Sequence, residues 1–373
     1  MGQAAWRRDV MTETGGDFLL MAHEDVQRLV HQLAAEAGAQ IEFGATVVKV
    51  SPGDPKPSVT VAGGEVITAD VIIGADGPRS LVREIVLGKK DSSKPVGWTV
   101  YGAVVPESYM LNDPELASWL TTNEWSIGVG EGKSICSHPV RAHKLYTIQI
   151  YWPDDQPEDA AESWYDVLPV DSVDATSLSP VFQRLLAGSP GLYRTRAMKH
   201  ERVDRWVHDS SRIVLLGEAA HPWIPGCSHP SAMAIEDAVV FGQLFSHLSS
   251  EDQISQFLNA YEEIRKERTE DVLEREISNT KMVTLHPGPE KDTRDASFRQ
   301  TRDKWDEGLL KAEFEGLFDL FGYDAYDAAE QWWVDWGRYN GKAVENDRRL
   351  SRLRFSFSAT TVKHERRTDF DDQ

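Results

Sequence analysis

Apolar residues recur at helical spacing near the start of the chain. Between residues 24 and 37 they stand at positions 26, 29, 30, 33, 34 and 37, and Gly38 follows as a stop signal. This pattern predicts an amphipathic helix. Short strands should follow over 40–43 and 46–50, and then a hairpin over 58–69 with Gly63-Gly64 in its turn.

Two short apolar runs predict strands of a different kind. In the segments 70–75 and 211–217, the residues from 71 and from 213 onward are continuously apolar, which is typical of strands buried on both faces of a parallel sheet. Between these runs the segments 98–105 and 144–152 alternate apolar and polar residues, which predicts a mostly antiparallel sheet. Helices are expected over 231–247 and 254–278, then a polar linker over 284–304 and further helices.

This succession predicts an α/β protein in which one domain is interrupted by another. The first domain takes residues 1–94 and resumes at 206–283, and the mostly antiparallel sheet occupies 95–205. A C-terminal helical region should cover 284–362, and the charged stretch 363–373 is expected to be a disordered tail.

Composition narrows the classes of function. The chain has 373 residues, enough for about two domains, and 60 acidic against 40 basic residues give a net charge of −20. That charge argues against nucleic acid and anionic membranes as partners. The sequence contains no run of about 18 apolar residues and no apolar signal region after Met1, and Cys136 and Cys227 are too few for a disulfide framework. We expect a cytoplasmic protein without a metal site.

Two strand–loop–helix segments carry the candidate chemistry. In the first, an apolar strand ends at Gly74, and Asp76 and Gly77 precede a helix that Pro78 and Ser80 open. In the second, residues 212–238, Glu218 follows a strand directly. Ligands of open α/β sheets bind at the carboxyl ends of the strands, so these acidic residues are candidates for ligand contact. Asp76 could equally cap its helix.

Together the two segments resemble the class A flavoprotein monooxygenases, the family of salicylate-hydroxylase-like aromatic hydroxylases. Residues 74–83 match every fixed position of that family's segment G-A-D-G-x-x-S-x-V-R, and 217–238 resemble its segment G-D-A-A-H-P…G-Q-G…E-D-A. The resemblance implies an FAD-binding Rossmann-like fold with an inserted substrate sheet. It further implies FAD as cofactor, NAD(P)H as reductant, O2 as oxidant and a small aromatic substrate.

The resemblance also implies site residues. Those expected to hold FAD lie in the two segments and on the first helix: Asp76, Gly77, Glu218, Ala219, Pro225 and Arg28. His221 is expected to be structural.

Several departures from the family concern the flavin. There is no G-x-G-x-x-G turn, so we expect the first strand–turn–helix unit to be absent and strand edges to be open to a second copy or a complementary chain. Ser228-His229-Pro230 replaces G-Q-G, and Pro230 lacks an N–H donor. His23 and Gly102 stand where the family has arginines, and Glu218 replaces an aspartate.

Other candidates have both a chemical and a structural interpretation. His229 could act as an acid or base, or be a surface histidine. Tyr101, Tyr146 and Trp152 could line an aromatic substrate pocket, or form the core of the sheet. A nucleophilic pair of Cys227 and His229 is a further hypothesis.

Three functions therefore remain open. The first is an FAD-dependent monooxygenase that hydroxylates an aromatic or polyketide-type molecule of secondary metabolism. The second is a flavin-free cyclase or isomerase on the same scaffold, motivated by the altered turn at 228–230. The third is a non-catalytic partner or an inactive truncated product.

Overall fold

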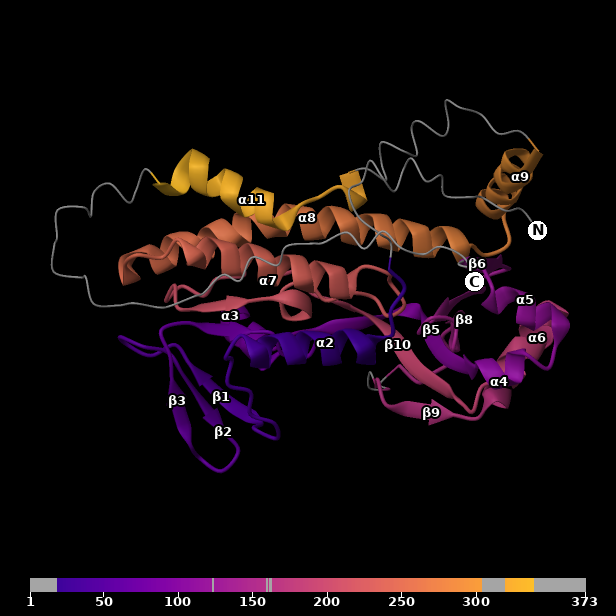
Figure 1. The fold of residues 1–373 in the computed structure, drawn as a ribbon, viewed down its shortest axis with the longest axis horizontal. Helices are drawn as coiled ribbons and strands as arrows, with labels where there is room; N and C mark the ends of the chain where they lie inside the picture. Colours follow the sequence, from indigo (N-terminus) through magenta and orange to yellow (C-terminus); the bar gives the residue numbers. More distant parts are fainter. Residues whose placement is uncertain (1–18, 123, 159, 161–162, 304–318, 339–373) are drawn as a thin grey trace, which may run out of the picture. The chain divides into compact units, whose positions relative to one another are not determined.

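A computed structural model describes residues 19–122, 124–158, 160, 163–303 and 319–338. The chain divides into two compact units, Met1–Glu330 and Gln331–Gln373. The expected mixture of helices with parallel and antiparallel sheets is confirmed within the first unit (Figure 1). The predicted tail over 363–373 and the predicted helices after residue 338 lie outside the described residues.

A two-stranded parallel sheet joins segments far apart in the sequence. Strands β4 (Ile72–Gly74) and β11 (Ile213–Leu215) pair so that Leu215 lies opposite Gly74. Helix α3 (Leu81–Leu87) follows β4 after a loop, and α7 (Pro230–Ser246) follows β11. The predicted strand–loop–helix order is therefore confirmed in both segments, and their loops start at the same edge of the sheet.

The first part of the chain also forms a small antiparallel sheet. Helix α2 (His23–Glu36) precedes strands β1 (Val47–Ser51), β2 (Ser58–Val61) and β3 (Val66–Thr68), which pair in the order β1-β2-β3. The turn between β2 and β3 contains Gly63 and Gly64, with φ angles of 108° and 93°. These positive angles explain why glycine is used in this turn.

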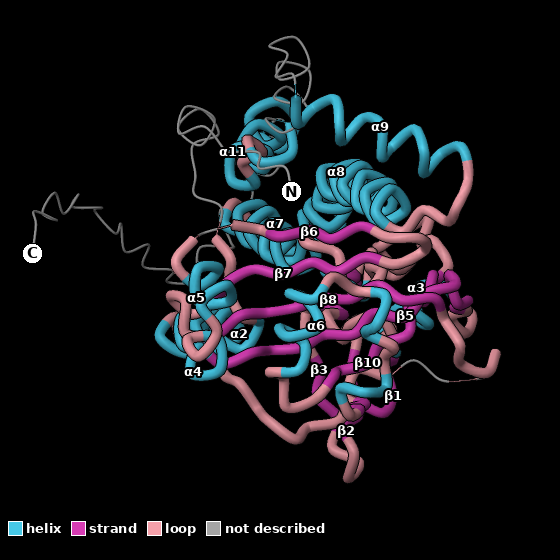
Figure 2. The backbone as a smooth tube through the Cα atoms, turned by 90° about the vertical axis from the view of Figure 1, so that its right-hand side faces the viewer, coloured by secondary structure: helices cyan, strands magenta, loops and turns pink. Residues whose placement is uncertain are grey.

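A six-stranded antiparallel sheet forms the largest layer (Figure 2). Its order is β6-β7-β8-β5-β10-β9, and its strands are β5 (Ser93–Pro106), β6 (Ser126–Val129), β7 (Ser134–Val140), β8 (Leu145–Pro153), β9 (Asp166–Leu168) and β10 (Leu192–His200).

The two faces of this sheet have different neighbours. On one face, Ala103, Val105 and Ile148 are fully or almost fully buried against the short helices α4 (Glu107–Met110), α5 (Pro114–Leu120) and α6 (Pro180–Ala187). Because side chains alternate along a strand, Val104 and Thr147, which pair with each other, face the other way. That second face forms part of the cavity described below.

Further helices follow these sheets in the chain. Helices α7 and α8 (Ile254–Val283) pack side by side, and α9 (Pro289–Asp303) and α11 (Ala325–Trp332) follow in sequence (Figures 1 and 2). A single π-helical turn, Trp333–Gly337, lies in the second unit.

Three local predictions were wrong. Residues 40–43 form no strand, and α9 occupies most of the expected linker over 284–304. Ile73 in β4 remains 41% exposed, although the apolar run predicts burial on both faces. The reason is that β11 is the one strand paired with β4 in the described part of the chain, and no other described element buries Ile73.

Helix α2 also keeps its apolar side exposed. It contains no buried residue, and Leu29, Val30 and Leu33 are about half exposed, at 48%, 49% and 54%. The open strand edges expected from the sequence stay a prediction.

Candidate active site

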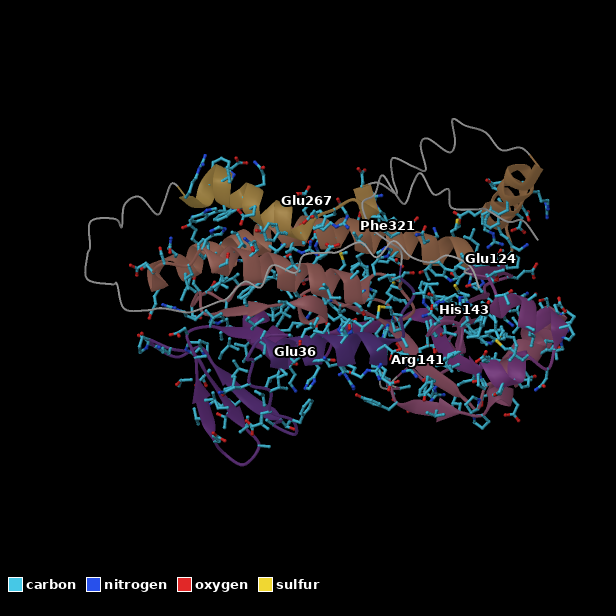
Figure 3. All side chains as sticks on the ribbon, viewed as in Figure 1. Glu36, Glu124, Arg141, His143, Glu267 and Phe321 are labelled. Atoms are coloured by element: carbon cyan, nitrogen blue, oxygen red, sulfur yellow. The ribbon has the colours of Figure 1, made fainter. Side chains whose placement is uncertain are left out.

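A cavity of about 560 Å3 lies between the second face of the six-stranded sheet and the loop that leads into α7. Strands β5, β7 and β8 provide Val104, His138, Val140, Leu145, Thr147 and Gln149. The loop and α7 provide Cys227, Ser228, His229, Ala232, Met233 and Glu236. Residues 19–23, Trp125, Arg268 and the segment of Leu320, Phe321 and Tyr323 complete the wall (Phe321 is labelled in Figure 3). Its size suits a small organic molecule.

The two strand-end loops present carboxylates at one edge of the parallel sheet. Glu218 follows β11 and is half-buried, whereas Asp76 follows β4 and is exposed. Asp76 accepts hydrogen bonds from the Ser80 hydroxyl and from the Val82 N–H at 3.3 Å, so it stabilises the start of α3. A Cβ at Gly77 would meet no atom within 4 Å. Carboxylate acceptors beside open space fit a polyhydroxylated chain.

Arg83, the last residue of the first motif, ties these loops together. Its side chain is fully buried, and it donates to the carbonyl oxygen of Ala219 at 3.0 Å and to that of Glu201. The motif arginine therefore fixes the position of the second loop from the first segment.

A buried polar network anchors the second loop to α7 and α8. Asp237 accepts from the Gly217 N–H at 2.9 Å and from Arg265 Nε at 2.8 Å, and its Oδ2 lies 2.6 Å from His221 Nε2. Trp223 Nε1 donates to the other ring nitrogen of His221 at 2.9 Å. Burial by itself raises the pKa of Asp237, but the hydrogen bond with His221 and the charge of Arg265 hold it below its ordinary value. Both nitrogens of His221 are thus engaged within the protein.

His229 lines the cavity and pairs with Glu276 of α8. Nδ1 of the imidazole bonds Oε1 of Glu276, whose other oxygen accepts from the Ser228 N–H at 3.2 Å. The side chains of His229 and Glu276 are only 16% and 9% exposed. Nε2 of His229 is buried and has no hydrogen-bond partner among the described residues.

The cavity's arginine is neutralised by its neighbours. Arg268 lies 3.4 Å from both oxygens of Glu236 and donates to the carbonyl oxygens of Leu320 at 2.6 Å and Asp319 at 3.1 Å. Its guanidinium also lies 4.6 Å from the centre of the Tyr323 ring.

Burial lowers the pKa of His138, which favours its neutral form.

The loop before His229 is held tightly against β8. Pro225 is buried, and the Tyr151 hydroxyl donates to the carbonyl oxygen of Gly226 at 2.5 Å. Gly226 has a φ of 90°, and a Cβ there would lie 2.5 Å from the same hydroxyl. A side chain at this position would displace the loop.

The three aromatic residues with both a pocket and a core interpretation lie in or against the core. Tyr101 and Tyr146 are buried in the core on the opposite face of the sheet, and Trp152 packs against that core under the ammonium of Lys133. None of the three lines the cavity. Because side chains alternate along β8, Thr147 and Gln149 face the cavity, whereas Tyr146 and Ile148 face the core.

The structure places Arg28 away from the cavity as well. Its side chain is 73% exposed and pairs with Asp25 on the same helix at 2.8 Å. His23, which the departure from the family pattern singled out, does line the cavity. Asp25 also binds Arg141 of the β7–β8 turn at 2.7 Å, which ties the start of α2 to the large sheet (Arg141 is labelled in Figure 3).

The thiol next to His229 is not prepared for nucleophilic attack. Burial and the neighbouring Glu276 raise the pKa of Cys227, so the thiolate is disfavoured. Nδ1 of His229 is bonded to Glu276, and not to the thiol. This geometry disfavours the hypothesis of a Cys227–His229 nucleophilic pair.

Sequence reasoning missed Glu276 altogether. It lies in a helix that is charged along its whole length, and no spacing distinguishes it from the other acidic residues there. Asp237 could have been found, because it is the aspartate of the E-D-A element in the second segment.

The described residues include neither a metal-ligand group nor a membrane-spanning helix. No group of three or more histidine, cysteine, aspartate or glutamate side chains is placed to hold a metal ion in this part of the chain. No helix in the same part is long and apolar enough to cross a membrane.

Comparison with known proteins gives consistent results. The family profile of the FAD binding domain matches residues 3–276. The FAD-dependent monooxygenase OpS4 of Beauveria bassiana is 24% identical over 327 residues, which is 87% of this chain and 76% of that protein. The 3-hydroxybenzoate 6-hydroxylase of Klebsiella oxytoca is 28% identical over 260 residues, 68% of this chain and 61% of that protein.

A solved structure shares the fold. A salicylate hydroxylase substrate complex superposes with a TM-score of 0.65 at 21% identity, covering 82% of this chain and 74% of that one. The chain spans 76%, 54% and 66% of the length of the first three curated relatives. The family match confirms the resemblance and the predicted FAD cofactor: the chain belongs to the FAD binding domain family, among the flavoprotein monooxygenases.

Proposed function

We propose that the protein is an FAD-dependent monooxygenase that hydroxylates a small aromatic or polyketide-type molecule of secondary metabolism, with NAD(P)H and O2 as co-substrates. The cavity is the observation that carries this proposal. It lies between the large sheet and the loop of the second FAD-binding segment. The names of the relatives, which include monooxygenases and aromatic hydroxylases, support the same class of reaction.

The strand ends offer the contacts that FAD needs for its polyhydroxylated chain. Glu218 and Asp76 would accept hydrogen bonds from hydroxyl groups, with Gly77 leaving room for the chain. Ala219, which is completely buried and whose carbonyl oxygen binds Arg83, would hold the loop in place. Pro225 would shape the loop between this edge and the cavity. When bound there, FAD supplies the redox chemistry that transfers one oxygen atom from O2. The protein's residues bind the substrate beside it and exclude water.

The domain division belongs to the same proposal. Residues 1–94 and 206–283 would form the FAD-binding domain, 95–205 the substrate sheet and 284–362 a helical region.

The cytoplasm is the proposed location. Cys136 and Cys227 are both free thiols, which supports a reducing environment. A second copy or a complementary chain would cover the exposed side of α2.

The proposal is tested by the visible spectrum of the purified chain. After incubation with FAD and desalting, we expect the protein to retain a flavin band. It should then oxidise NAD(P)H and insert one atom of 18O from 18O2 into a phenol. A folded chain that stays colourless would contradict the proposal.

A pair of variants locates the cofactor. Glu218→Ala should lower FAD retention several-fold, because the half-buried carboxylate at the strand end is lost. Asp209→Ala removes a carboxylate that is 92% exposed in the loop before β11 and should retain FAD like the unchanged chain. Equal retention by both variants would remove Glu218 from the cofactor site.

A flavin-free cyclase or isomerase is the second candidate. The observation that favours it is the pairing of His229 with Glu276 in the cavity wall, since an acid–base pair can act without a redox cofactor. Turnover by the colourless chain, with no NAD(P)H consumed, would establish this function instead.

A further inference from the structure

The pairing of His229 with Glu276 determines which ring nitrogen is basic. A carboxylate accepts hydrogen bonds, so the nitrogen that faces Glu276 must carry the proton of the neutral imidazole. That nitrogen is Nδ1. Nε2 therefore keeps its lone pair and can accept a proton.

The basic nitrogen lacks a partner in the protein. Nε2 is buried and has no hydrogen-bond partner among the described residues, although His229 belongs to the cavity wall. A buried polar atom without a partner lowers stability. A hydroxyl group bound in the cavity would provide the missing donor. His221, by contrast, has both of its nitrogens bonded within the protein.

The cavity offers no unpaired cation to a charged substrate. Arg268 is the only arginine or lysine among the described residues of the wall, and Glu236 and two carbonyl oxygens already engage it. The carboxylate of Glu236 lies in the wall, and that of Glu276 lies behind it, against His229. A substrate carboxylate would lose its hydration without gaining a partner, which costs free energy.

From these observations we propose that the cavity binds an uncharged phenol and that Nε2 of His229, oriented by Glu276, accepts the proton of its hydroxyl group. The substrate class rests on the proposed monooxygenase function, whereas the proton transfer does not depend on it. Nothing in the family resemblance supplies this histidine, because it stands where the family has glutamine.

The step balances in atoms and charge. The O–H bond of the phenol breaks, its electron pair stays on oxygen, and the proton forms a new bond with Nε2. The imidazolium that results is balanced by the carboxylate of Glu276, which makes Glu276 a positioning residue and His229 the catalytic base. The phenolate has an electron-rich ring, which favours attack by an electrophilic oxygen atom.

The proton transfer can be measured with 4-nitrophenol, whose ionised form is yellow. We expect the full chain, with and without added FAD, to lower the apparent pKa of the bound probe by about one unit relative to the free probe. His229→Asn should abolish this shift. Glu276→Gln keeps an acceptor for Nδ1 but loses the charge, so the shift should shrink while the probe still binds.

His247 provides a matched control. It also pairs with a glutamate, Glu330, at 2.7 Å, but it lies at the other end of α7 and outside the cavity. His247→Asn should leave the pKa of the bound probe as in the unchanged chain. The proposal is overturned if the unchanged chain shows no shift, or if His229→Asn, folded by circular dichroism, retains it.

The charge of the substrate is tested with 2-hydroxy-5-nitrobenzoate, which adds a carboxylate to the same nitrophenol. It should bind at least about tenfold more weakly than 4-nitrophenol. Equal or tighter binding would refute the uncharged class. These outcomes are independent of the flavin experiment: a chain that retains FAD but does not ionise the probe refutes the His229 step alone, and the reverse result refutes the monooxygenase.

Discussion

At the scale of single residues, Asp237 joins three groups that hold the second loop in place. Its two oxygens bind the Gly217 N–H, His221 and Arg265, which belong to the second loop and to α8. Asp237 and Arg265 are both completely buried. Their charges compensate each other where water cannot reach them.

We predict that Asp237→Asn lowers the free energy of unfolding by about 3 kcal/mol, since it leaves Arg265 with less compensation in the interior. Urea denaturation measures this loss. Asp70→Asn is the control, because Asp70 pairs with Lys56 on the surface, where both side chains are about half exposed. A loss of stability that is no larger than the control's would contradict the role assigned to Asp237.

The same carboxylate predicts a dependence of stability on pH. Its pKa in the folded state lies below the ordinary value of 3.8, so protonation favours the unfolded chain. The contribution is complete above pH 3.8 and is lost as the pH falls through the lower, folded value. Between about pH 5 and about pH 2.5, the free energy of unfolding should fall less steeply with acid in Asp237→Asn than in the unchanged chain.

At the scale of elements, the six-stranded sheet separates core from cavity. Ile148 is completely buried on the core face, and its neighbour Thr147 lines the cavity. Adjacent side chains of β8 thus lie in different environments, because successive side chains point to opposite faces of the sheet.

Substitutions at Ile148 and Thr147 should affect different properties: the first stability, the second binding in the cavity. Ile148→Ala should lower the free energy of unfolding by about 2–5 kcal/mol through the space it leaves in the core. Thr147→Leu should change stability little but weaken binding of 4-nitrophenol several-fold by filling part of the cavity. Urea denaturation and probe titration of both variants measure the two effects. If Thr147→Leu were as destabilising as Ile148→Ala, the assignment of faces would be wrong.

At the scale of the whole molecule, the exposed apolar side of α2 is a candidate surface for association. Leu29 and Leu33 are about half exposed, and Ile73 of β4 is 41% exposed. Apolar surface of this kind is typical of sites that associate with another chain or segment. The net charge of −20 opposes unspecific aggregation.

We predict concentration-dependent association of the unchanged chain in light scattering. The double variant Leu29→Glu and Leu33→Glu should shift it toward the monomer, because it replaces the apolar side with charge. The double variant Gln27→Glu and Gln40→Glu adds the same charge at exposed polar positions and should associate like the unchanged chain. A monomer at every concentration would show that α2 is not an association surface.

Much of the local structure followed from the sequence. Apolar spacing predicted α2, the β2–β3 hairpin and the strands β4 and β11, because hydrophobic periodicity depends only on near neighbours. The two motif segments predicted the family and its cofactor, because a glycine, an acidic residue and a helix start must follow one another at set spacing to form such a loop. The strand predicted over 40–43 was wrong and α9 was missed, since short or strongly polar segments have a weak periodic signal.

The composition of the site required the folded chain. Tyr101 and Tyr146 could not be distinguished from cavity residues by type, because the face that a strand residue occupies depends on what packs against each side of the sheet. Glu276 meets His229 across 47 residues of sequence, through the packing of α8 against the loop before α7. Local sequence thus determined the elements and the family, whereas tertiary packing determined which side chains share the cavity, since contacts between distant segments leave no periodic trace in the chain.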